Sequence, residues 1–303
     1  MLRHFSRRCQ ATTMILPRIS FLIVTCLLCA LLTLENGPCF AAEPAKNEYV
    51  LGVFPFLPTA NLEGIFAPIA AELSRALGKP VRLRLTSSYG SFIAALKDQS
   101  FDIIHVHPFD YVQFGRPKGY HPLVARSEDL FAQFSVKINA PITKLADLKG
   151  KRLGTPPATG AVTYLALDAV HKAGLTPGKN LTVQHFPNHL ACLQQLQIGT
   201  VDSCATSAST LKTFESQFGL PLKRIGHSLS IPHTLFAAHT RIPAADREII
   251  KKTLLSSSLA QVDPQLRQLF IESGDAATGS YFKAVGDRDY DSTRRILRQL
   301  GSR

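Results

Sequence analysis

The sequence lacks the motifs that identify the common classes of enzyme. It contains no Gly-x-Ser-x-Gly nucleophile elbow, no phosphate-binding P-loop and no dinucleotide-binding fingerprint. Polar residues near expected strand ends, among them Ser88, Ser91 and Thr159, have no general base at a motif spacing. The sequence therefore favours a noncatalytic binding protein, and a hydrolase of phosphoesters is a less favoured interpretation.

Signals for metal and nucleic-acid binding are also scarce. No pair among the 10 histidines combines an i, i+4 spacing with an acidic neighbour, as helical zinc sites do. His105 and His107 lie two residues apart on an expected strand, so their side chains point to opposite faces. The formal net charge is +12, but no aromatic residues are interleaved with a basic run. We therefore expect no metal, no cofactor and no nucleic-acid partner.

Few cysteines remain outside the N-terminal region. Four of the six lie within the first 39 residues, which leaves Cys192 in an expected helix and Cys204 in the expected strand that follows. In an oxidising compartment, two such residues favour a disulfide. Two buried free thiols are the alternative, because burial is the common state of free cysteine.

Only one stretch of the sequence is long and apolar, and it lies near the N-terminus. Four arginines precede the apolar residues 19–34, and the small residues Ala41 and Ala42 lie after this stretch. This pattern is typical of a secretory signal peptide, which we place at residues 1–42. An uncleaved anchor is the alternative, although the apolar stretch is short for a membrane span. The remaining chain is expected to be a soluble exported protein.

After the leader, strand-like and helix-like patterns alternate. Residues 49–54, 81–85 and 101–106 have the composition of strands, whereas residues 62–77 and 91–96 have apolar side chains at helical spacing. A second unit of the same kind covers residues 142–226. This alternation predicts the α/β class with a mostly parallel sheet. In such sheets ligands bind beyond the carboxyl ends of the strands, where Ser87–Gly90 and His105–Pro108 are expected.

Several short segments, in their order and spacing, resemble the phosphate, phosphite and phosphonate substrate-binding proteins of ABC importers. The resemblance extends over residues 49–300, and its pieces are Leu51-Gly52-Val53, Tyr89, Phe101-Asp102-Ile103, residues 145–152, Ala173-Gly174-Leu175, His189, Gly199-Thr200-Val201-Asp202, Ile231-Pro232 and Asp287-Arg288-Asp289-Tyr290.

The resemblance implies a type 2 periplasmic binding protein fold, in which two α/β lobes joined by two crossover segments close over a ligand. Lobe one would comprise residues 48–134 and 236–303, and lobe two residues 135–235. The crossovers would lie near residues 131–139 and 232–236. The implied protein is a periplasmic monomer that captures a small oxyanion and delivers it to an ABC transporter permease. Signalling to a membrane histidine kinase is the alternative role.

The resemblance also implies a set of ligand contacts. Relatives bind an anion at the start of the helix that begins here near Thr159, with Gly160 and Ala161 completing the turn. Tyr89 matches a tyrosine that donates a hydrogen bond to the ligand, and His189 matches a histidine that contacts the anion. His107 is the histidine that we expect beside the ligand. Helix capping by Thr159 or His189, and simple packing by Tyr89, are the alternatives.

At other positions of the implied site, this sequence departs from its relatives. Phe131 stands where relatives often have a tyrosine, and Ala158 and Ala161 replace hydroxyl residues in the anion-binding turn. Ser209 and Thr234 stand where aminophosphonate binders have acidic residues for the ligand amine. The sequence therefore disfavours an aminoalkylphosphonate and favours a ligand with fewer polar groups.

Overall fold

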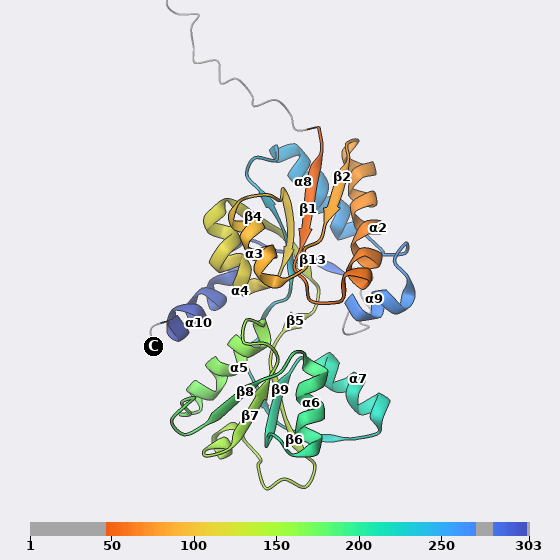
Figure 1. Ribbon diagram of the computed structural model, residues 1–303. Coiled ribbons are helices and arrows are strands. Elements are labelled where there is room, and N and C mark those ends of the chain that lie inside the picture. The colour runs from red at the N-terminus through yellow and green to blue at the C-terminus, as the bar shows by residue number, and fades with distance from the viewer. Residues whose placement is uncertain (1–46, 271–280, 302–303) are drawn as a thin grey trace, which may run out of the picture. The chain divides into compact units, whose positions relative to one another are not determined.

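The computed structural model describes residues 47–270 and 281–301, so the expected signal peptide at residues 1–42 lies outside the described residues. The described chain forms two large mixed sheets, each covered by helices, and one short two-stranded ladder (Figure 1). The α/β class is confirmed. No helix within the described ranges is long and apolar enough to cross a membrane.

The first sheet contains six strands in the order β13-β4-β12-β3-β1-β2. Strands β1, β2 and β3 are parallel, whereas β4, β12 and β13 run antiparallel to their neighbours. Two of its five adjacent pairings are thus parallel, so this sheet is not mostly parallel as expected. Its strands are β1 (Tyr49–Val53), β2 (Val81–Arg84), β3 (Ile103–Val106), β4 (Tyr120–Arg126), β12 (Leu235–His239) and β13 (Phe282–Ala284).

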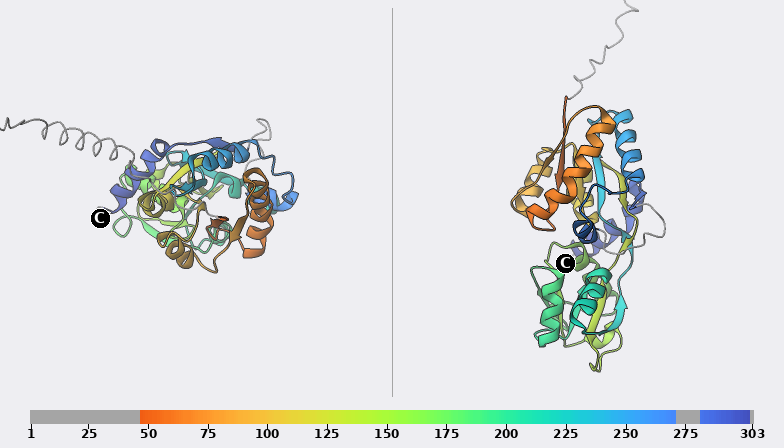
Figure 2. Two further views of the ribbon diagram at one scale, coloured as in Figure 1. Left: turned by 90° about the horizontal axis from the view of Figure 1, so that it is seen from above. Right: turned by 90° about the vertical axis from the view of Figure 1, so that its right-hand side faces the viewer.

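Helices cover both faces of the first sheet (Figure 2). Strand β1 is buried throughout, and its alternate residues enter different cores. Leu51 and Val53 pack with α2 (Thr59–Leu77) and α8 (Ala244–Ser256), whereas Val50 packs with α3 (Tyr89–Lys97). The remaining elements of this part are α4 (Pro108–Asp110), η1 (Tyr111–Gly115), η2 (Arg116–Lys118) and α9 (Pro264–Phe270).

A buried carboxylate joins three segments beneath this sheet. Asp102 is fully buried, accepts a hydrogen bond from the backbone N–H of Val50 at 2.8 Å and pairs with the guanidinium of Arg241 at 2.7 Å. Pairing and hydrogen bonding of this kind offset the cost of burying the charge. The contact fixes the start of β3 against the start of β1 and the turn after β12.

The second sheet contains five strands in the order β10-β6-β9-β7-β8. Strand β7 is parallel to β8 and β9, and β6 is antiparallel to β9 and β10. The strands are β6 (Gln133–Lys137), β7 (Arg152–Thr155), β8 (Thr182–His185), β9 (Ser203–Thr206) and β10 (Leu222–His227). Their helices are η3 (Leu145–Leu148), α5 (Ala161–Lys172), α6 (His189–Ile198) and α7 (Ala208–Phe218).

Two short strands connect the sheets and pair with each other. The chain leaves the first sheet through β5 (Asp129–Leu130) and returns through β11 (Ile231–Pro232). These strands are antiparallel, with Leu130 opposite Ile231 and Asp129 opposite Pro232. The crossing strands lie slightly earlier in the chain than residues 131–139 and 232–236, because the segment from Gln133 onward is already part of the second sheet.

The last helix, α10 (Asp291–Gly301), packs against α5 and α4 rather than only against the first sheet. Its Ile296 is buried in the same cluster as Phe134, Leu153 and Val162. Just before it, η5 (Asp287–Tyr290) contributes Asp287, whose carboxylate accepts a hydrogen bond from Tyr111 at 2.6 Å. The C-terminal segment therefore contacts elements that belong to both sheets.

A disulfide joins Cys192 of α6 to Cys204 of β9, with their Cα atoms 6.0 Å apart. The sulfur of Cys192 also lies against β7, because a Cβ added to Gly154 would approach it to 2.9 Å. A side chain at Gly154 would therefore displace the disulfide or the strand. The bond fixes the helix that begins with His189 to the strand that precedes Ser207.

Reduction of this disulfide should lower the stability of the protein. The two cysteines are 12 residues apart, and a closed loop of this size stabilises the folded state by about 3 kcal/mol. We expect dithiothreitol to lower the free energy of unfolding of a chain of residues 43–303 by about this amount. Urea unfolding with and without reductant measures the change. The same chain with Cys192→Ala and Cys204→Ala should not respond to reductant. Two titratable thiols in the unreduced, denatured chain would contradict the bond.

Candidate ligand-binding site

Helix N-termini and loops that bear polar groups follow the parallel strands of both sheets. In the first sheet, α2, α3 and α4 follow β1, β2 and β3, and in the second, α5, α6 and α7 follow β7, β8 and β9. The first N–H groups of a helix lack intrahelical partners and favour negative charge. Every residue predicted from the relatives, except Phe131 and Thr234, lies in one of these junctions.

Tyr89 is the first residue of α3, where the Ser88 side chain caps the helix by accepting a hydrogen bond from the N–H of Ser91. The hydroxyl of Tyr89 donates to Asp110 Oδ1 at 2.5 Å. Burial, followed by the charge of Asp110, raises the pKa of Tyr89 far above its ordinary value. Tyr89, the expected donor to a ligand, therefore already uses its only hydroxyl proton in a hydrogen bond to a carboxylate.

His107 follows β3 and caps α4, where its Nδ1 accepts a hydrogen bond from the N–H of Asp110 at 3.3 Å. Its ring meets Phe54 edge to face, with centroids 5.7 Å apart. His107 is 5 % exposed, and His105 is fully buried among Phe66 and Phe236. Burial lowers the pKa of His105 well below its ordinary value, so His105 is a neutral core residue.

The turn before α5 differs from the expected one. Its N-cap is Gly160 rather than Thr159, which is exposed, and no side chain accepts a capping hydrogen bond. Thr163 instead donates from inside the helix to the carbonyl of Pro157 at 3.0 Å. The capping role considered for Thr159 is thus wrong. Gly160 and Ala161 present the first backbone groups of α5.

His189 begins α6, and its Nδ1 accepts a hydrogen bond from the N–H of Ser207 at 3.1 Å. Ser207 caps α7, and its hydroxyl lies 3.2 Å from that of Ser209 and 2.8 Å from that of Thr210. The structure thus brings His189 and Ser209 together through Ser207. A neutral His189 in this arrangement carries its proton on Nε2, the orientation needed to donate to an anion.

The two remaining expected residues lie near the crossing strands. The ring of Phe131 meets that of His227 edge to face at 5.8 Å. Thr234 is buried, and its N–H donates to His233 Nδ1 at 2.7 Å. Burial, followed by the charge of Arg126, lowers the pKa of His233 well below its ordinary value. Thr234, which stands where aminophosphonate binders have an acidic residue, thus lies beside a histidine with a lowered pKa.

Sequence reasoning missed Asp110, Ser207 and Tyr164. Tyr164 lies in α5 and stacks on Phe109 of α4, with ring centroids 4.6 Å apart. The only signal for Asp110 was its position three residues after His107. A helix-capping side chain often accepts a hydrogen bond from the backbone N–H at this spacing. Nothing in the sequence pattern showed that Tyr89, from another helix, would bond to it.

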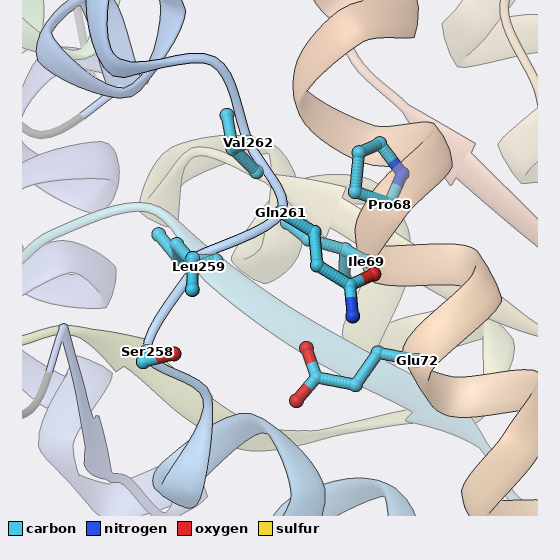
Figure 3. Close-up of a pocket in the computed structure, with 8 residues that line it drawn as sticks. Pro68, Ile69, Glu72, Ser258, Leu259, Gln261 and Val262 are labelled. Carbon is cyan, nitrogen blue, oxygen red and sulfur yellow. The ribbon is translucent and has the colours of Figure 1, made fainter.

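Two hollows lie in the described chain, and the larger one reaches His185 at the end of β8. One of about 60 Å³ lies between α2 and residues 258–262 (Figure 3). Glu72, which lines it, accepts a hydrogen bond from Ser257. Another of about 600 Å³ runs along β8 and α5 and is lined by Leu167, Val183 and Leu300. Over the ranges that the structure describes, no three histidine, cysteine or acidic side chains converge as a metal site would require.

Solved structures of binding proteins share the fold. PhnD1 from Prochlorococcus marinus, solved in complex with methylphosphonate, is 16% identical with a TM-score of 0.67, covering 84% of this chain and 98% of PhnD1. A binding-protein component of an ABC phosphonate transporter from Pseudomonas aeruginosa is 14% identical with a TM-score of 0.62, covering 83% and 85%. The aliphatic sulphonate binding protein SsuA from Escherichia coli is 13% identical with a TM-score of 0.62, covering 84% and 93%.

These identities are low, so the similarity demonstrates the type 2 periplasmic binding protein fold and not a ligand. The sequence itself gives the family. Residues 51–282 match the family model for the phosphonate, periplasmic substrate-binding protein of ABC transporters. The chain belongs to this family of periplasmic transport proteins, which are binding proteins rather than enzymes and deliver a small ligand to a transporter permease.

Proposed function

We propose that this protein is exported through a signal peptide at residues 1–42 and captures a small oxyanion of the phosphonate, phosphite or phosphate kind. The observation that carries the proposal is the arrangement of helix starts after the parallel strands of both sheets. Positive helix ends and unpaired N–H groups at these junctions suit an anion. Residues 43–303 contain 30 Lys and Arg against 21 Asp and Glu, and this formal net charge of +9 adds long-range attraction for such ligands.

The second sheet supplies the groups that we assign to the anion. Helix α5 begins at Ala161 without a side-chain cap, which leaves the first N–H groups of the helix for a ligand, whereas the N–H of Gly160 donates to the carbonyl of Pro157. His189 and the hydroxyls of Ser207 and Ser209 form the neighbouring polar cluster. Thr159 adds a further hydroxyl next to this turn. These groups donate hydrogen bonds, as recognition of an oxyanion requires.

Closure of two lobes over the ligand fits the connections between the sheets. We assign residues 48–134 and 236–303 to one lobe and residues 135–235 to the other. The strands β5 and β11 pair with each other, are each two residues long, and carry the chain from the first sheet to the second and back. Bending at such short segments is the usual means of hinge closure. The protein acts as a monomer, and delivery to a permease takes precedence over signalling to a histidine kinase because the family is defined by transport.

Removal of the His189 side chain should weaken anion binding without unfolding the protein. A hydrogen bond to a charged group contributes roughly 1.5–3 kcal/mol, so we expect His189→Ala to weaken methylphosphonate binding by about 10- to 100-fold. Titration calorimetry measures the change. His171→Ala is the matched control, because His171 is exposed near the end of α5 and should leave the affinity unchanged.

Two substitutions of Gly160, one that adds a charge and one that does not, test whether an anion binds at the start of α5. Gly160 has φ −74° and ψ 143°, which other residues adopt, and aspartate and serine are both good N-caps. We expect Gly160→Asp to retain stability but to lose at least about 10-fold in affinity for methylphosphonate, because the added carboxylate repels the ligand. Gly160→Ser should bind within about 3-fold of the wild-type protein. Equal binding by the two variants would exclude an anion at this turn.

A further inference from the structure

Asp110 is a buried carboxylate with an unused acceptor. It is 2 % exposed and ends α4, directly after β3. Its Oδ1 accepts the hydrogen bond from Tyr89, but its Oδ2 makes no hydrogen bond. His107 Nε2 lies 3.0 Å from Oδ2, although the atoms are not aligned for a hydrogen bond. In the described chain no hydrogen bond therefore uses the lone pairs of Oδ2.

No permanent cation compensates this carboxylate. Among the described residues, no lysine or arginine nitrogen forms an ion pair with Asp110. His107 Nδ1 accepts the hydrogen bond from the Asp110 N–H, so this ring nitrogen is not a donor to the carboxylate. A buried carboxylate without a lysine or arginine partner is costly unless donors reach it.

Asp110 also lies near Tyr164, which belongs to the first part of the helix that follows the proposed anion-binding turn. The residue beside it, Phe109, stacks on Tyr164 in the first part of α5. Asp110 affects the pKa of Tyr164, as both Asp110 and Tyr164 affect that of Tyr89. The helix that begins at Ala161 is thus packed against the residues around the carboxylate. An oxyanion held at the start of α5 would direct one oxygen toward this side.

The negative charge of Asp110 determines whether an ionised or a protonated oxygen of the ligand can lie next to it. A fully ionised oxygen meets a like charge in a buried environment and is repelled. A protonated oxygen instead donates a hydrogen bond to the carboxylate, and such charge-assisted bonds are among the stronger ones. The Tyr89 hydroxyl cannot replace this donor, because its single proton already goes to Oδ1.

We propose that Asp110 is the specificity-determining residue of the site and selects oxyanions that retain an acidic proton. Monoprotonated phosphonates, phosphite and phosphate have a hydroxyl that can donate to Oδ2, whereas sulfonates and sulfate do not near neutral pH. Tyr89 is then a positioning residue that fixes the carboxylate. This inference rests on the proposed function, since it concerns the same site.

Two shape-matched ligands test the inference. Methylphosphonate and methanesulfonate are both small tetrahedral anions, and only the first retains a proton. By calorimetry at neutral pH, we expect the wild-type protein to prefer methylphosphonate by at least about 10-fold. Asp110→Asn should reduce this preference to within about 3-fold, because the amide donates a hydrogen bond to an unprotonated oxygen. Asp168→Asn is the control, since Asp168 is equally buried and pairs with Lys172. It should keep the wild-type preference.

The pH dependence gives a second readout that a merely structural role would not change. Wild-type affinity for methylphosphonate should fall as pH rises through the second ionisation of the ligand, because the proton that Asp110 binds is lost. In Asp110→Asn this fall should disappear. Tyr89, His107 and Tyr164, the titratable groups around Asp110, are the same in both proteins. Thermal melting verifies that the variant is folded, and Asp110→Ser replaces it if it is not.

The possible outcomes separate this inference from the proposed function. If the wild-type protein binds both anions equally, or if Asp110→Asn keeps the preference and the pH dependence, the specificity role of Asp110 is wrong and the oxyanion function stands. If the wild-type protein binds neither anion nor phosphate or phosphite, the proposed function fails, and the inference fails with it.

Discussion

Parallel strand pairing is the constraint on which the rest of this structure depends. Because β1 pairs in parallel with β2 and β3, and β7 with β8 and β9, each strand must return through a helix. All carboxyl ends within a set then meet at one edge, together with the helix starts that follow them. The topology of each sheet alone therefore brings these helix starts together, whatever side chains they carry. The antiparallel strands extend the sheets and lead into the crossing strands.

The strand–helix junctions of the two sheets carry polar groups of different kinds. In the proposed site, the donors come from the second sheet, at the start of α5, His189 and the neighbouring hydroxyls. The first sheet contributes the Asp110 carboxylate, which accepts a hydrogen bond from Tyr89. Under this proposal a ligand that contacts both sets of groups accepts hydrogen bonds at one end and donates at the other. The absence of acids at Ser209 and Thr234 therefore does not make the site free of acidic groups, because Asp110 lies at a different position.

The sequence predicted the elements of this fold better than the contacts within its site. Apolar periodicity identified β1, α2 and β3, because burial of one helix face or of a whole strand leaves a local pattern. The partners of Tyr89 and His189 could not be predicted, since Asp110 and Ser207 approach them from other elements. The cap of α5 was misplaced by one residue because Thr159 is a better intrinsic cap than Gly160. The packing of α10 on α5 was missed because tertiary contacts leave no local signal.

The disulfide has a practical consequence for the production of this protein. It connects α6, which begins with His189, to β9, which leads into Ser207, so one covalent bond holds both halves of a polar cluster. In a reducing cytosol, thiols are kept reduced and this bond does not persist. Secretion into an oxidising compartment, or oxidative refolding, is therefore the appropriate route to material in which the second sheet has its native covalent structure.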